Sequence, residues 1–540
     1  MGTPKVSVIV PVHNCAGSLD RTFRSVFEQT LPDEVIEIIA VDDGSTDGGG
    51  EVLDRLAAGR PGFVVVHQPA SGGPGRPRNV GIERATGEYV FFLDADDWLG
   101  PEALERCCAM ADENGTDVVV PKYVGVGRRV HPELFKENVE FATISDPVPN
   151  LYGSITALKL YRRALLERHH IRFPEGVLSG EDQIFAVRAY FEAKGVSVVA
   201  DHDCYYWVAR EDGTSALQRG GAPAELYFPE IDRLMAFVSE RTGPGPVRDR
   251  LLRRHFAVEV FSRFDPRYQA FDAGERHATR EAARRLLERY GNDGIMRHLP
   301  PYARLIGHAL RHRMDELVDE AARVRAERPQ RYVLDGDRVF AVYPGFRDGR
   351  LGVPDEVYAV SQPPEQKWFL SGVEWRDGRL AVRGYAIAEP LGEAAAWSGE
   401  LVVRRRGGTG EHRTPFERVG TTDDGRAVLG AEIDPLAAAD APGRYDVFVS
   451  APYRGRVHEG RLGAGDIAVP EAGGPAMGDG RPVVTPYLTA GTSSLALRVS
   501  AVAPAPGTET SAGRPGPLRP AVVAERAARL LRRVLGGGPS

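Results

Sequence analysis

Cysteine is scarce in this sequence, and no two cysteines have the spacing of a metal-binding motif. Among 540 residues there are four cysteines, two of them adjacent at Cys107 and Cys108. This count excludes a disulfide-stapled secreted scaffold and a zinc site built from Cys-x-x-Cys pairs. We expect the thiols to be reduced and mostly buried.

Long apolar runs and an excess of basic charge are also missing. No run approaches the roughly 18 apolar residues of a membrane-spanning helix, and no basic and apolar leader precedes Val6. The chain carries 75 acidic and 68 basic residues, whereas general nucleic-acid binders have a basic footprint. We therefore expect a cytoplasmic protein with no nucleic-acid partner.

The N-terminal part of the chain alternates short apolar runs with helical patterns. The alternating segments are 6–12, 17–29, 36–41, 50–58, 63–67, 78–85 and 89–93. Continuous apolar strands separated by helices are typical of an α/β fold with a mostly parallel sheet and flanking helices. Ligands of such folds bind beyond the C-terminal ends of the strands.

Three acidic residues directly follow the last of these apolar runs. The sequence Tyr-Val-Phe-Phe-Leu-Asp-Ala-Asp-Asp-Trp places Asp94, Asp96 and Asp97 at the end of a buried strand. Two carboxylates at spacing i, i+2 can hold a hard divalent cation whose other positions accept substrate phosphate. The alternative is an Asp-rich turn that caps the next helix.

Other polar residues stand at or after the ends of neighbouring segments. Pro11 is close to the end of the first strand, Asp43 ends the second, and a Gly-rich loop leads to Arg78. A strand-end carboxylate can accept a hydrogen bond from a uracil ring or a ribose hydroxyl, and the arginine fork matches phosphate. The alternatives are a turn after the second strand and a solvated helix-start charge at Arg78.

Five segments occur in a characteristic order along the chain. They are Val6-Ser-Val-Ile-Val-Pro-Val-His-Asn, Val41-Asp-Asp-Gly-Ser-Thr-Asp, Arg78-Asn-Val-Gly, Gly87-Glu-Tyr-Val-Phe-Phe-Leu-Asp-Ala-Asp-Asp and Gly180-Glu-Asp. Together they resemble glycosyltransferase family 2, whose members have the GT-A fold. One departure is His13, where the family usually has tyrosine.

The resemblance implies a site for a UDP-sugar donor. Pro11 and Asp43 would contact the uridine, Arg78 the nucleotide, and Asp94 the ribose. Asp96 would bind the Mn2+ or Mg2+ that bridges the diphosphate, and this cation would offset the charge of the departing UDP.

The same resemblance implies the rest of the site. In related enzymes a stretch like 205–215 closes over the diphosphate, where Arg210 and Ser215 could donate to phosphate oxygens. Asp182 would act as the base that takes the proton of the acceptor hydroxyl, and Glu181 would orient the acceptor or the base. Capping of the following helix is the alternative for these two acidic residues.

The pattern along the chain predicts five segments. Residues 1–220 form the catalytic domain, 221–330 a helical linker domain, and 331–500 an all-β, sandwich-like domain. Residues 501–520 are rich in proline, glycine and alanine and predict a disordered linker. Residues 521–536 predict a basic amphipathic helix, which either lies on an anionic membrane surface or docks on a partner.

This layout is similar to that of the wall teichoic acid glycosyltransferases that add N-acetylglucosamine to polyribitol phosphate. In those relatives the C-terminal region forms homotrimers, which implies a homo-oligomer here. The helix at 521–536 would keep the protein peripheral on the inner face of the cell membrane.

The sequence thus predicts an inverting, metal-dependent glycosyltransferase that uses a UDP-sugar to decorate a cell-surface polymer or a lipid-linked glycan. A capsule or exopolysaccharide glycosyltransferase is the alternative of the same class. A carbohydrate-binding scaffold without turnover and a nucleotidyltransferase, which would release pyrophosphate, are alternatives of other classes. The presence of Asp94, Asp96 and Asp182 argues against the scaffold.

Overall fold

The structure is a computed structural model in which two units can be distinguished. The first contains the described residues up to Arg263 together with Ala270–His298, and the second contains Phe264–Gln269 and the described residues from Leu299 onward. The described residues are 3–130, 132–177, 180–209, 222–327, 330–390, 399–408, 410–422, 425–438, 441–464, 467, 469–470, 483–490 and 493–500.

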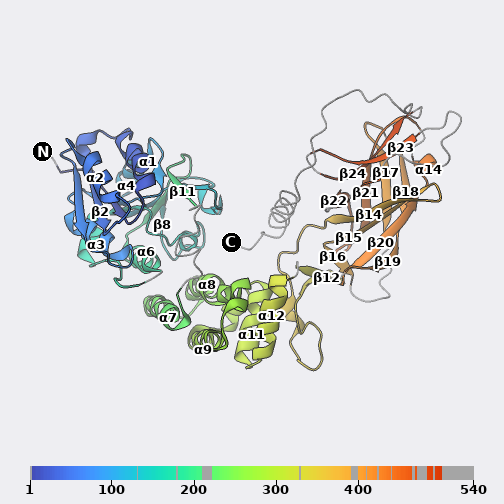
Figure 1. The fold of residues 1–540 in the computed structure, drawn as a ribbon. Helices are drawn as coiled ribbons and strands as arrows, with labels where there is room; N and C mark the ends of the chain where they lie inside the picture. Colours follow the sequence, from blue (N-terminus) through green and yellow to red (C-terminus); the bar gives the residue numbers. More distant parts are fainter. Residues whose placement is uncertain are drawn as a thin grey trace. The chain divides into compact units, whose positions relative to one another are not determined.

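The centre of the first unit is an eight-stranded, mixed sheet (Figure 1). In spatial order its strands are β3 (Phe63–Gln68), β2 (Ile36–Asp43), β1 (Val6–Val12), β4 (Tyr89–Phe92), β9 (Leu160–Arg162), β6 (Val118–Val120), β10 (Val196–Val198) and β8 (Val139–Ala142). The first four are parallel to one another, so their C-terminal ends share one edge of the sheet. The apolar residues of β1, β2 and β4 are buried because helices cover the sheet, whereas Val64 of the edge strand β3 is 41% exposed.

Six helices accompany this sheet. They are α1 (Ala16–Phe27), α2 (Gly49–Ala57), α3 (Gly75–Arg84), α4 (Ala103–Asn114), α5 (Arg163–Arg168) and α6 (Glu181–Glu192). Helix α3 packs directly on β1, because a Cβ atom at Gly81 would lie 2.3 Å from Cγ2 of Ile9. With α3 packed in this way, its first turn, which contains Arg78, lies at the C-terminal edge of the sheet.

The first turn of helix α6 contains two acidic side chains. Gly180, which precedes it, has φ of +90°, a left-handed conformation that glycine adopts without strain. Glu181 and Asp182 therefore occupy the first turn, next to the unpaired N–H groups of the helix.

A small sheet lies beside the turn that follows β4. Its strands are, in order, β5 (Trp98–Leu99), β11 (Tyr205–Val208) and β7 (Tyr123–Val126). Trp98 stacks on Tyr206, with ring centroids 5.2 Å apart. Strand β11 thereby brings Tyr205 close to the acidic residues after β4.

The region after the α/β part is helical, as predicted. Helices α7 (Ala224–Arg241), α8 (Pro246–His255), α9 (Ala273–Tyr290) and α10 (Asp293–Met296) belong to the first unit. Helices α11 (Pro301–Arg311) and α12 (Asp315–Glu327) belong to the second.

The second unit contains a ten-stranded β structure in two layers that pack on one core. One layer contains β14 (Trp368–Arg376), β15 (Arg379–Ala386), β19 (Glu417–Thr421) and β20 (Ala427–Ile433). The other contains β17 (Glu400–Arg405), β18 (Glu411–Pro415), β21 (Gly443–Tyr453), β22 (Arg456–Ala464), β23 (Val483–Leu488) and β24 (Leu495–Ser500). A separate small sheet is formed by β12 (Arg331–Asp335), β13 (Arg338–Val342) and β16 (Ala388–Pro390).

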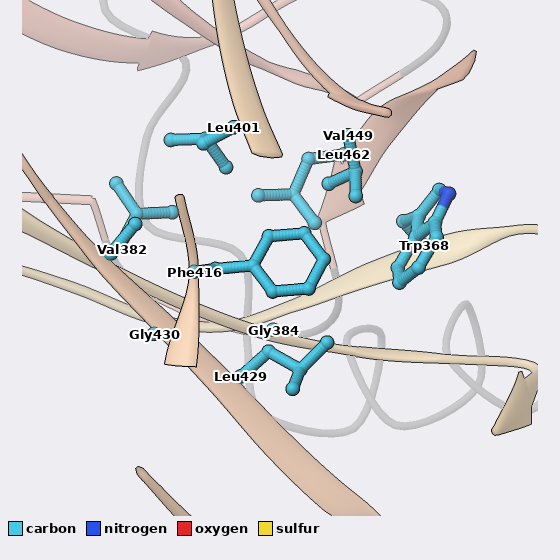
Figure 2. Close-up of a pocket in the computed structure, with 10 residues that line it drawn as sticks. Trp368, Val382, Gly384, Leu401, Phe416, Leu429, Gly430, Val449 and Leu462 are labelled. Atoms are coloured by element: carbon cyan, nitrogen blue, oxygen red, sulfur yellow. The ribbon is translucent and has the colours of Figure 1, made fainter. Parts of the chain in front are cut away.

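Apolar side chains from both layers meet around a small cavity (Figure 2). Phe416 and Trp368 lie with ring centroids 6.1 Å apart, and Leu401, Val449 and Leu429 line the space beside them. The lining is entirely apolar, so the cavity belongs to the core of the β domain.

The predicted fold class is confirmed, from the mostly parallel sheet through the helical linker to the sandwich-like β domain. The predicted domain borders stay predictions. Residues 501–520 and the predicted helix at 521–536 lie outside the described residues. Within the part of the chain that is described, no helix is both long and apolar enough to cross a membrane.

Candidate active site

The three acidic residues after β4 lie together in one turn. Each of Asp94, Asp96 and Asp97 offers a carboxylate oxygen within 4.8 Å of the other two. Asp94 and Asp96 are half-buried, and Asp97 is buried. A set of ligands made only of oxygen fits a hard divalent cation such as Mn2+ or Mg2+ better than a thiolate-seeking metal.

Neighbouring elements hold this turn in place. The Thr22 hydroxyl of α1 lies 2.9 Å from the Ala95 carbonyl oxygen and 2.8 Å from that of Asp97. From β11, the Tyr205 hydroxyl donates to Asp97 at 2.7 Å and accepts from the Asp94 N–H at 3.1 Å. The acidic turn is therefore fixed by both the helix layer and the small sheet.

Asp97 differs from its two neighbours in its surroundings. Desolvation, together with the charges of Asp94 and Asp96, raises the pKa of Asp97 to about 8. Its carboxyl oxygens accept from Tyr205 and from the Val208 N–H, so both are used inside the protein. Asp97 thus supports the turn, while Asp94 and Asp96 have the more exposed carboxylates.

One guanidinium group joins the acidic turn to the start of α6. Arg78 is 4% exposed, and its two terminal nitrogens donate to Asp94 at 2.8 Å and to Glu181 at 3.0 Å. Burial acts to lower the pKa of Arg78, but the charges of Asp94 and Glu181 raise it overall. A solvated helix-start charge is therefore the wrong interpretation of Arg78, because the first turn of α3 is largely buried.

Asp182 lies next to this charged group. Desolvation, followed by the charge of Glu181, raises the pKa of Asp182 to about 7, although Arg78 acts in the opposite direction. The carboxylate accepts the N–H of Gln183 at 2.8 Å. A carboxyl group with a pKa near neutrality can accept a proton and release it again.

The second strand supplies a separate polar group at the same edge of the sheet. The carboxylate of Asp43 is buried and accepts from Gln68 at 2.6 Å and from the Ser71 hydroxyl at 2.8 Å. His13, after β1, hydrogen-bonds through Nδ1 to the Asp43 carbonyl oxygen at 2.8 Å. Pro11 is half-buried in β1, opposite Val41 of β2.

The structure thus joins several of the predicted site residues by direct contact. Asp94, Arg78 and Glu181 form one chain of ion pairs, and Asp96 lies beside Asp94. Pro11 and Asp43 lie at the C-terminal ends of neighbouring strands. The predicted phosphate contacts Arg210 and Ser215 lie outside the described residues.

Comparison with known proteins places the chain in a family. The family model Glycosyl transferase family 2 matches residues 7–169, and the model Glycosyl transferase TarS linker domain matches residues 224–322. Poly(ribitol-phosphate) beta-N-acetylglucosaminyltransferase TarP of Staphylococcus aureus is 33% identical over 235 residues, which are 43% of this chain and 71% of TarP. The chain belongs to glycosyltransferase family 2.

Two further relatives cover more of this family 2 glycosyltransferase. The poly(ribitol-phosphate) beta-glucosyltransferase of Bacillus spizizenii is 27% identical over 489 residues, which are 85% of this chain and 72% of that protein. The crystal structure of S. aureus TarS 1-349 in complex with UDP-GlcNAc is 26% identical, with a TM-score of 0.54, and the match covers 63% of this chain and 97% of that one. The predicted family and the predicted class of enzyme are both confirmed.

Two supporting contacts of this glycosyltransferase were not predicted from the sequence. Tyr205 binds Asp97 although 108 positions separate them, and Gln68 binds Asp43 across the β2–β3 pair. The pairing of Asp43 with Gln68 could have been inferred from the sequence, because Gln68 directly follows the third apolar run and Asp43 closely follows the second. The stretch 205–215 was predicted to close over the diphosphate, but nothing in it indicated that Tyr205 would bind Asp97.

Replacing Arg78 with methionine is expected to destabilise the first unit. The change would leave Asp94 and Glu181 without their shared cation, and breaking a buried ion pair in this way typically costs about 3 to 5 kcal/mol. We take about 3 kcal/mol as the expected loss of unfolding free energy, because the Asp94 side chain is 30% exposed. Urea denaturation followed by circular dichroism measures it.

The control for this change is Arg84→Met, at the exposed C-terminal end of α3. It should leave the urea midpoint within experimental error, since an exposed charge on a helix contributes little. Arg78→Lys should be intermediate, because an ammonium cannot reproduce the planar fork that reaches two carboxylates. Equal midpoints for Arg78→Met and wild type would show that the buried ion pairs do not stabilise the unit.

Proposed function

We propose that this enzyme transfers a sugar from a UDP-sugar to a hydroxyl group of a cell-surface polymer of the poly(ribitol phosphate) type, with inversion at the anomeric carbon. Support comes from the relatives, which are named for transfer of glucose or N-acetylglucosamine to poly(ribitol phosphate). The TarS structure that resembles this chain holds UDP-GlcNAc. Both sugars are therefore donor candidates here.

The observation that carries the proposal is the contact of one buried guanidinium with two separate acidic groups. Arg78 donates both to Asp94 in the acidic turn and to Glu181 at the start of α6. This contact links Asp94, which is proposed for the donor, to Glu181, the sequence neighbour of Asp182, which is proposed as the base. A scaffold that only binds carbohydrate has no need for this juxtaposition.

Each donor contact is proposed for a residue at the C-terminal edge of the sheet. Asp43 and Pro11 would contact the uridine, and Asp94 the ribose. Asp96 would hold Mn2+ or Mg2+, which when bound supplies positive charge that stabilises the diphosphate leaving group. Asp43 is buried and its carboxylate already accepts hydrogen bonds from Ser71. The uridine would therefore contact Asp43 at the edge of the hydrogen bonds between these two residues.

The transfer itself needs one proton acceptor on the protein. The oxygen of the acceptor hydroxyl attacks the anomeric carbon while the bond from that carbon to the diphosphate oxygen breaks. Asp182 takes the hydroxyl proton, and UDP leaves with the electron pair of the broken bond. Arg78 offsets the charges of Asp94 and Glu181, and Asp182, next to Glu181 in the sequence, would be the basic group.

A screen for UDP release tests the proposal. Purified enzyme with Mn2+ is offered UDP-glucose, UDP-N-acetylglucosamine and other nucleotide sugars, with and without poly(ribitol phosphate). We expect release of UDP that increases when the polymer is added, together with incorporation of the sugar into the polymer. Release of pyrophosphate would indicate a nucleotidyltransferase, and transfer only to capsular or exopolysaccharide acceptors would contradict the proposed acceptor.

A further inference from the structure

Side chains of helix α1 contact both peptide groups that flank Asp96. The hydroxyl oxygens of Ser18 and Thr22 lie 2.7 and 2.9 Å from the carbonyl oxygen of Ala95. The terminal nitrogen Nη2 of Arg21 donates to the carbonyl oxygen of Asp96 itself at 2.9 Å. These two carbonyl groups belong to the peptide units before and after the Asp96 Cα atom.

The two peptide units restrain the direction of the Asp96 side chain. Each peptide unit is planar, so the backbone has only two soft torsion angles per residue. Holding the planes on both sides of Asp96 restrains both of these torsions, and with them the direction of the Cα–Cβ bond. Helix α1 thereby sets the direction of the carboxylate that is proposed to hold the cation.

Arg21 differs from the two hydroxyl groups because it is exposed. A long exposed side chain loses much rotamer freedom when it is held in one position. Here an aromatic surface offsets that loss, because the Arg21 guanidinium carbon lies 4.2 Å from the centroid of the Trp98 ring. Trp98 pairs with Tyr206 across β5 and β11, and the two rings stack at an interplanar angle of 10°. The guanidinium that donates to the Asp96 carbonyl is therefore placed by a fixed aromatic pair.

We propose that Arg21 is a positioning residue for the proposed metal ligand Asp96. Its guanidinium, stacked on Trp98, binds the Asp96 carbonyl oxygen and holds the carboxylate in the direction that the divalent cation requires. The inference rests on the proposed function, because it requires Asp96 to hold Mn2+ or Mg2+. Side chains that fix a metal ligand without touching the metal typically change metal affinity by about 10- to 100-fold when they are replaced.

The affinity for Mn2+ tests this role without turnover. Arg21→Met removes the hydrogen bond but keeps an apolar side chain beside Trp98, and Arg24→Met, at another exposed arginine of α1, is the matched control. In calorimetric titrations of Mn2+ into full-length enzyme with UDP, the Kd for Mn2+ should rise about tenfold in Arg21→Met only. The urea midpoint of Arg21→Met should match that of wild type, since exposed substitutions change stability little.

The sign of the change separates positioning from a simple effect of charge. Removing a positive charge close to a cation site would by itself strengthen Mn2+ binding. Weaker binding in Arg21→Met therefore cannot come from the lost charge. Arg21→Lys keeps the charge but not the planar group that both donates and stacks, so its Kd should be intermediate. If Arg21→Met lowers the urea midpoint, Arg21→Lys decides the question.

Activity at different metal concentrations gives a second readout. At limiting Mn2+, UDP release by Arg21→Met should fall below that of wild type. Saturating Mn2+ should return its kcat to within about twofold of wild type, because the ligand is present but poorly held.

The possible failures are distinguishable. The same Kd for Mn2+ in wild type and both Arg21 variants, or tighter binding in Arg21→Met, overturns the role of Arg21. Absence of Mn2+ binding to wild type in the presence of UDP contradicts the proposed metal site instead.

Discussion

Replacing Asp182 with asparagine should lower kcat/KM for sugar transfer by about 10² to 10⁴-fold, the usual contribution of a general base. Asparagine has nearly the same shape, but it cannot accept the proton of the acceptor hydroxyl. UDP binding should persist, because Asp182 is proposed to act on the acceptor and not on the donor. Initial rates of UDP release, together with calorimetric titration of UDP, measure the two effects separately.

The matched control is Asp33→Asn, an exposed carboxylate before β2, which should keep wild-type kinetics. Circular dichroism of Asp182→Asn should match that of wild type. If Asp182→Asn instead kept more than about a tenth of wild-type kcat/KM, another group would have to be the base.

The pH dependence of the wild-type enzyme follows from the same residue. Desolvation and the charge of Glu181 raise the pKa of Asp182 to about 7, and only the ionised form can accept a proton. We therefore expect kcat/KM to rise with pH through about 7 and to level off above about 8. A profile that is flat between pH 5 and about 8 would exclude Asp182 as the titrating base.

Replacing Asp96 with asparagine is the second change with a large expected effect. An amide is a neutral and weaker ligand than a carboxylate, and the divalent cation is proposed to stabilise the departing diphosphate by several kcal/mol. Activity at saturating donor should fall about 100-fold or more. The affinity for Mn2+, measured by calorimetry in the presence of UDP, should fall as well.

Chelation of the wild-type enzyme provides the comparison for Asp96→Asn. EDTA should remove most of its activity, and added Mn2+ or Mg2+ should restore it, whereas excess metal should restore Asp96→Asn only in part. If Asp96→Asn kept full metal-dependent activity, Asp96 would not be the metal ligand, and Asp94 would be the remaining candidate.

Much of the fold could be predicted because its signals are local. The apolar run predicted at 6–12 coincides with β1, and those predicted at 36–41, 63–67 and 89–93 match β2, β3 and β4 within two residues. A run of valine and isoleucine between two turns has few other ways to bury its side chains.

The order and pairing of the strands after β4 were harder to predict from the sequence. β9 pairs antiparallel with β4 and lies between β4 and β6, although it comes after β8 in the sequence. Short strands such as Leu160–Arg162 have too few residues to show a hydrophobic periodicity. The strands with which they pair depend on the packing of segments that are far apart in the sequence. The order of the sheet therefore had to come from the structure.

The predicted homo-oligomer, the membrane contact of residues 521–536 and the phosphate contacts of Arg210 and Ser215 stay predictions. The cytoplasmic location stays a prediction too. Each depends on a partner, a surface or a segment outside the described residues.

The sequence alone determined which acidic groups stand at strand ends and at the start of a helix, because both positions follow from hydrophobic periodicity and turn residues near them in the chain. Only the tertiary structure decided that Arg78 lies buried between Asp94 and Glu181, the latter 103 positions away from Arg78. The physical reason is that burial and the pairing of distant charges depend on how helices pack on the sheet. That packing sets the pKa of Asp182, and no single segment of the chain encodes it.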